Sequence, residues 1–270
     1  MAEKLTKQEK EEFKEKSAKY KEKIQEIDKE KKMLLSIIKK NPEIAPYAKI
    51  RSTIFSIQKA SICTDLAILS QIIQNIRGDN YLNDARKEIY GILTDFLSMY
   101  DIDFYSSLTD NQEFLEKISE MKPDHRYNFL KALYEITNRI YELELQGKYR
   151  WSFPEIYQKL ALIVFLFLDF KLLEKTKNPD MPYYDALHKH LELLIEILQK
   201  AAQEYRSKYE LASKDLDTLQ NLKKILELLK RIYNFSGDQN EEQKISFALE
   251  STKEKIESLL SKEKKEDKKK

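Results

Sequence analysis

The sequence predicts an all-α protein, an elongated up-and-down bundle of helices with coiled-coil-like helices at its N- and C-terminal ends. Three observations lead to this prediction. The chain of 270 residues contains only 4 Gly and 6 Pro, fewer than sandwiches, barrels and phosphate-binding loops use. Apolar residues recur at spacings of three and four along most of it. Hydrophobic residues make up 41% of the chain, which is enough to form a core and excludes wholesale disorder.

Residues 1–43 are predicted to form a charged N-terminal helix, from Thr6 to about Lys40. One heptad register is complete, with Phe13, Tyr20, Ile27 and Leu34, whereas the second has apolar residues only at Ile24 and Ile38. A self-sufficient coiled coil needs both registers. We therefore expect this helix to pack weakly on a neighbour. Pro42 and Pro46 should end it, since proline disfavours helix before it and cannot donate within one.

A helical body with fewer charges is predicted over residues 44–200. Its second helix, about 46–77, has only two charged residues between Ser52 and Ile76, which indicates that other helices surround it. The Gly78 turn precedes a third helix, and a polar connection then leads to a short fourth helix with Asp110 and Glu113 as its capping box. A fifth helix begins at Pro123 and ends at Gly147. The sixth begins at Ser152, contains the apolar run 160–168, and should extend to Asn178, with Asp180 capping the next.

The C-terminal part has the clearest periodicity. The spacing between successive apolar residues alternates between three and four positions from Tyr184 to Tyr205, and the same spacing returns from Leu222 to Ile232. Residues 183–236 therefore form either one long helix or two helices with a bend near Ser213. A last helix, about 240–261, completes a coiled-coil-like segment over 201–261. The Lys-rich tail 262–270 is too polar to fold alone, so we expect it to be disordered.

Motifs that would indicate catalysis are missing from the sequence. It has no G-x-x-x-x-G-K or G-x-G-x-x-G phosphate loop, no G-x-S-x-G and no H-E-x-x-H. The single Cys63 stands among apolar neighbours, which predicts a core position rather than a reactive thiol. We therefore expect no catalytic, cofactor-binding or metal site, and a protein that is not an enzyme.

Three polar residues are candidates for a functional polar spot inside the bundle. Asp65 and Asp169 each interrupt an apolar stretch, where an unpaired buried carboxylate would be costly. His188 shares a helix face with Asp185 and Glu192. The alternative is that both aspartates point outward or pair with a basic side chain. For the histidines, the alternative is that His188 and His190 lie on the surface, beside the apolar residues with which their helix packs.

The sequence therefore predicts a non-enzymatic function: a structural or adaptor protein that binds other proteins, or itself, through amphipathic helix faces. Helix-in-groove or coiled-coil association would be the mechanism. One candidate surface is the incomplete first seam, with Phe13, Tyr20, Ile24 and Ile27. The other is the basic-aromatic loop that contains the only Trp, with Tyr149, Arg150 and Trp151.

Two other classes of function remain open. The first 40 residues carry 13 Lys and 9 acidic residues, a charge of +4, and the Lys-rich ends would suit a nucleic-acid-associated protein, although acidic residues are interleaved with them. A helical-bundle enzyme or small-ligand binder with a pocket in the body is the third class. The N-terminus has no signal-peptide pattern and no apolar run is long enough to span a membrane, so we expect a cytoplasmic location. A chain that had lost an export signal would look the same.

Overall fold

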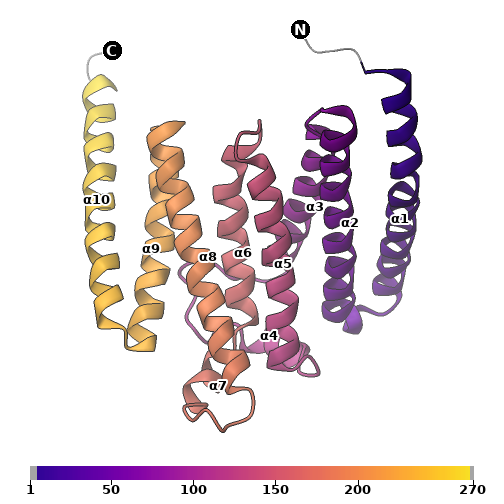
Figure 1. Cartoon of the computed structure of the whole chain (residues 1–270). Coiled ribbons are helices and arrows are strands. Elements are labelled where there is room, and N and C mark those ends of the chain that lie inside the picture. The colour runs from indigo at the N-terminus through magenta and orange to yellow at the C-terminus, as the bar shows by residue number, and fades with distance from the viewer. Residues whose placement is uncertain (1–4, 268–270) are drawn as a thin grey trace. The chain divides into compact units, whose positions relative to one another are not determined.

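A computed structural model describes residues 5–267, with side chains described to Ser261, and confirms the all-α prediction. The model is 82% helical, and the described residues contain no strand. Neighbouring helices pack up and down (Figure 1). The helices are α1 (Lys7–Lys40), α2 (Ala45–Gln74), α3 (Asp79–Leu97), α4 (Gln112–Lys117), α5 (Pro123–Glu144), α6 (Phe153–Phe167), α7 (Phe170–Lys175), α8 (Tyr184–Leu211), α9 (Leu216–Ser236) and α10 (Gln239–Asp267), with short 3-10 turns η1 (Pro42–Ile44) and η2 (Arg150–Ser152).

The chain divides into two compact units. The first contains the chain up to Ser98 together with Lys117–Met121 and Asn128–Arg150, and the second contains Met99–Glu116, Lys122–Tyr127 and the chain from Trp151 onward. The predicted segments 1–43, 44–200 and 201–261 were defined by charge and helix length, whereas these units group residues by contact.

In the first unit, α2 packs against both α1 and α3. The start of α1 has the geometry that its sequence favours: the Thr6 side chain accepts a hydrogen bond from the Glu9 backbone N–H, and the Glu9 carboxylate accepts one from Thr6. Its end lies at Asn41, directly before Pro42. The charge-poor α2 buries residues on several of its faces, as predicted, and Cys63 is among them.

A cluster of charged and polar side chains connects α1 with α2 and α3. The Glu88 carboxylate on α3 accepts hydrogen bonds from Lys31 of α1 and, at 2.8 Å, from Ser56 of α2. Lys59 reaches Asp28 at 2.6 Å and Glu88 at 3.5 Å. Burial alone would raise the pKa of the Glu88 carboxyl, but the hydrogen bonds from Lys31 and Ser56 and the nearby Lys charges lower it below its usual value.

In the second unit, α6 is buried over nearly its whole length and packs on α8, which contacts α9, which in turn contacts α10. The prediction that the sixth helix runs on to Asn178 was wrong. The helix ends at Phe167, and the Asp169 side chain caps a separate helix, α7, by accepting from the Leu172 N–H at 2.9 Å. The buried Asn111 amide donates to the carbonyls at the end of α6, those of Phe165, Leu166 and Leu168.

Four other boundaries differ from the prediction or decide between its alternatives. Residues 212–215 separate α8 from α9, and Asp215 caps α9 by accepting from the Thr218 N–H at 2.7 Å, so 183–236 is not one helix. Asp110 accepts from Ser107 instead of capping α4, and α8 begins after Tyr183 rather than at Asp180. Helix α10 continues through residues 262–267 of the predicted disordered tail, because Lys and Glu favour helix. Residues 268–270 lie outside the described part.

Candidate interaction surfaces

The first predicted surface, the seam of α1, is largely occupied by the chain itself. Phe13 and Ile27 are buried, with 9% and 2% of their surfaces exposed, and the Phe13 ring lies 6.2 Å from that of Tyr81 on α3. Ile24 is half-buried, and Tyr20 is exposed. The physical reason is that the apolar register is the face with which α1 packs on α2. Phe13 and Ile27 are therefore core residues, and only Tyr20 and Ile24 stay available to a partner.

The outer side of α1 carries apolar residues that the seam did not include. Met33 and Ile37, four residues apart, expose 52% and 45% of their surfaces on this side, and Leu35, about 200° around the helix from Met33, exposes 58%. After Glu30 the helix has no further acidic residue, and its remaining charged residues are four lysines. The C-terminal part of α1 is thus both apolar and basic on its exposed side.

The second predicted surface, the basic-aromatic loop, is half-buried. The Arg86 guanidinium carbon lies 4.6 Å from the centre of the Tyr149 ring, and that of Arg150 lies 4.8 Å from the centre of the Tyr141 ring. Both contacts are within cation–π distance and lie within the first unit. Trp151 is half-buried and belongs to the second unit. The interaction role of this loop stays a prediction.

The two candidate aspartates are half-buried, and each already has a structural role. Asp65 accepts a hydrogen bond from Arg139 at 2.5 Å, which is the pairing with a basic side chain foreseen as the alternative. Asp169 is the cap of α7 and also accepts from the Gln112 amide at 3.4 Å. Asp65 belongs to the first unit, whereas Asp169 and His188 belong to the second.

The two histidines of α8 differ from the prediction. His188 is half-buried, and its ring stacks on that of Tyr184 with centroids 3.9 Å apart. His190 is not on the surface: it is 1% exposed, and its Nε2 lies 3.0 Å from the Val164 carbonyl oxygen of α6. Burial lowers the pKa of His190 to about 4, so at neutral pH the ring is uncharged and its Nε2–H donates to that carbonyl. Within residues 5–267, no three His, Cys, Asp or Glu side chains are grouped so that they could hold a metal ion.

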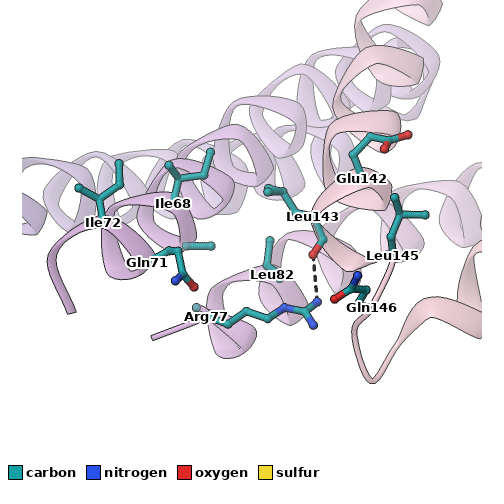
Figure 2. A pocket seen from close by; sticks show the side chains of 11 residues that line it. Ile68, Gln71, Ile72, Arg77, Leu82, Glu142, Leu143, Leu145 and Gln146 are labelled. Atoms are coloured by element: carbon teal, nitrogen blue, oxygen red, sulfur yellow. Dashed lines mark hydrogen bonds between the residues drawn. The ribbon is translucent and has the colours of Figure 1, made fainter. Parts of the chain in front are cut away.

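A pocket of about 500 Å³ lies in the first unit, between the end of α2, the start of α3 and the end of α5 (Figure 2). Its lining is mostly apolar, with Ala67, Ile68, Ile72, Leu82, Leu143 and Leu145, and Gln71, Arg77, Glu142 and Gln146 add polar groups. Arg77 donates to the Leu143 carbonyl at 2.9 Å and to the buried Glu144 carboxylate at 3.2 Å. None of Asp65, Asp169 and His188 lines this pocket, so the polar residues chosen from the sequence do not identify it.

The model of the TP0443 family matches residues 9–260 of the chain. The chain belongs to the TP0443 family. No curated protein matches this family member. Among solved structures, one titled "DHF58 filament" is similar to it, with 15% sequence identity and a TM-score of 0.37, over 92% of this chain and 97% of that one.

The sequence of this TP0443 family member contains a signal for the exposed part of α1 that the apolar periodicity does not reveal. An acid-free stretch with two lysine pairs around Met33, Leu35 and Ile37 is visible in residues 31–40, although exposure cannot be read from spacing alone. The pocket had no such signal, because its lining comes from three helices. Among the described residues, no helix combines the length and apolar character that spanning a bilayer requires.

Proposed function

We propose that this protein is a non-enzymatic structural or adaptor protein that binds other proteins through the exposed outer face of α1. The observation that supports this proposal best is the pair of exposed apolar side chains at Met33 and Ile37. Met33 and Ile37 are four residues apart and therefore adjacent on the helix surface. Apolar side chains that stay accessible on a helix, bordered by charged ones, are typical of helix–helix recognition.

Copurification from native cells tests this proposal. The tagged chain is purified with and without nuclease, and compared with a variant in which Met33 and Ile37 are changed to Ser. We expect a stoichiometric protein that survives nuclease and is lost from the variant. A control with Ile54→Ser, which changes an exposed apolar residue of α2 outside the pocket, should keep it. A partner profile identical in all three samples would exclude the α1 face, and material removed by nuclease would favour the nucleic-acid alternative.

The pocket beside Arg77 supports a second candidate function, the binding of a small apolar ligand. Its volume lies within the roughly 300–1,000 Å³ that ligand sites occupy, and most of its lining is apolar. The dye anilinonaphthalene sulfonate is a suitable probe. We expect its fluorescence to rise with the wild type and to fall with Ile72→Glu and Leu145→Glu, whereas Ile54→Glu, outside the pocket, should have no effect. Equal fluorescence with all of these proteins would contradict ligand binding here.

A further inference from the structure

Two exposed stripes of opposite charge lie on the first and last helices of the chain. On α1, the residues Lys29, Lys32, Met33, Ser36, Ile37 and Lys40 each lie three or four positions from other members of the set and so share one helix face. On α10, the residues Phe247, Glu250, Ser251, Glu254, Glu257 and Ser258 do the same. Every one of these residues is exposed. We call them the basic stripe and the acidic stripe.

The stripes match in length and in chemistry. Each covers eleven residue steps, about 16 Å of helix at roughly 1.5 Å per residue. The basic stripe has three lysines around Met33 and Ile37, and the acidic stripe has three glutamates beside Phe247, whose side chain is 77% exposed. An exposed Phe on a glutamate-rich helix face is an apolar anchor without a partner in the described structure, and the basic stripe presents the apolar side chains that it would fit.

Most of the charges in the stripes are free to bind a partner. Among the described residues, Lys32 and Lys40 have no carboxylate within ion-pair distance, and Glu254 and Glu257 have no basic group within it. Glu250 is paired with Lys253 at 2.7 Å, an exposed pair of little energetic weight. Two further lysines of α10, Lys244 and Lys255, lie at the edges of the acidic stripe, and Lys244 is paired with Glu241. Lys262, Lys264 and Lys265 follow the stripe in the sequence.

Within each unit, the helix that carries the stripe lies at an edge. Helix α1 packs on α2, and α10 packs on α9 (Figure 1). The inward faces are filled, by Phe13 and Ile27 on α1 and by Leu249 and Thr252 on α10. The stripes are on the opposite sides of these two helices, so neither is needed for folding of its own unit.

We infer that the occupant of the basic stripe is the acidic stripe of a second copy of this chain. The inference rests on the proposed function, for which it names the partner. Because two different surfaces meet, the contact either repeats from copy to copy into open chains or rings, or closes as a two-fold pair in which α1 of each copy meets α10 of the other. The three opposite charges on each side make the association weaken as salt is added, since charges at the rim of an exposed contact are screened.

Sedimentation velocity of the full-length chain tests this inference. At low salt we expect the average mass to rise above that of the monomer as the protein concentration increases, and to fall towards the monomer at high salt. Two triple variants remove the complementarity: Lys29→Glu, Lys32→Glu and Lys40→Glu in one, and Glu250→Lys, Glu254→Lys and Glu257→Lys in the other. Each should lower the association constant at least tenfold. Lys and Glu favour helix about equally, so circular dichroism should show both variants folded.

Mixing the two triple variants is the decisive step. The first variant has acidic stripes on both edge helices and the second has basic stripes on both, so each alone should be monomeric and their equimolar mixture should associate. The control variant Lys10→Glu, Lys14→Glu and Lys19→Glu makes the same charge change on exposed residues in the first half of α1, and should associate as the wild type does.

Three outcomes would overturn the inference: a wild type that stays monomeric at every concentration, association that neither triple variant weakens, or a mixture that does not associate. Binding to phosphatidylglycerol vesicles is measured for the wild type and for both triple variants. If the wild type binds the vesicles and only the lysine variant does not, the basic stripe binds lipid and the inference is wrong. None of these outcomes decides the adaptor proposal, which depends on the proteins that copurify. The two can therefore fail separately.

Discussion

At the scale of single residues, His190 makes stability depend on pH. Its pKa is about 4 in the folded protein and near the ordinary 6.5 in the unfolded chain. The unfolded state therefore binds a proton that the folded state excludes between these values. The stabilising contribution is fully present above pH 6.5 and is lost as the pH falls towards 4, by about 3 kcal/mol in total.

The prediction is that His190→Gln removes this pH dependence. The Gln amide can still donate to the Val164 carbonyl but does not titrate, so the free energy of unfolding should change less between pH 6.5 and 4 than in the wild type. Urea unfolding at several pH values measures the difference. The matched control is His188→Gln, at a half-buried ring two residues away, which should keep the wild-type slope. Equal slopes for wild type and His190→Gln would contradict the assignment.

Two glycines give a second contrast at the residue scale. A Cβ added at Gly147 would lie 1.7 Å from Glu144 Oε2 and 2.2 Å from Arg77 Nη2, whereas one added at Gly91 would meet nothing within 4 Å. Gly147→Ala should therefore break the Arg77–Glu144 contact beside the pocket and destabilise the protein by about 1–3 kcal/mol. Gly91→Ala, within α3, should stabilise it by roughly 0.5–1 kcal/mol. Chemical denaturation of both variants measures the change in the free energy of unfolding. If Gly147→Ala raised it, the Arg77 and Glu144 side chains would be able to move aside without destabilising the protein.

At the scale of elements, α1 has an inner and an outer face with opposite sensitivity to mutation. Ile27→Ala removes a side chain that is 2% exposed and should lower the free energy of unfolding by about 2–4 kcal/mol. Met33→Ala, at a residue 52% exposed, should change it by less than about 0.5 kcal/mol. Thermal unfolding followed by circular dichroism compares the two. If both variants lost a similar free energy of unfolding, α1 would have to be rotated about its axis, with a different face packed against α2.

The elements themselves could be predicted from the sequence where their signals are local. The start of α1 at Thr6 depends on residues three apart, and the end of α9 depends on Gly237, whose φ of 76° suits glycine. The break at Asp169 could not be predicted in this way. An aspartate in an apolar run fits either a buried charge or a helix cap, and the choice is fixed by Asn111, which is distant in sequence and binds the end of α6.

The candidate surfaces were harder to predict, because periodicity finds an apolar face but does not say what covers it. The seam of Phe13 and Ile27 has the spacing of an interaction helix, yet α2 covers it within the same unit. Conversely, His190 has the sequence context of a surface residue and is buried against Val164. In each case the deciding contact joins residues far apart in the chain, and a local pattern contains no information about it.

At the scale of the whole molecule, the distribution of charge matters more than its sum. The net charge of +2 over 270 residues gives little repulsion between copies, which favours association. The charges on the edge helices are separated, however, with lysines on the outer side of α1 and glutamates on the outer side of α10. Weak overall repulsion and local complementarity together make association dependent on salt and concentration.

Hydrogen exchange gives the corresponding prediction for the full-length protein. Helices that bury one side open more readily than those covered on several sides. At high salt, α1 should therefore exchange faster than α2, and α10 faster than α9. At low salt and high concentration, protection should rise in residues 29–40 and 247–258 and stay constant in α2 and α9, because the stripes become covered while the cores do not change. A uniform rise over all helices would indicate general stabilisation, and protection of only one stripe would mean that the partner is not a second copy.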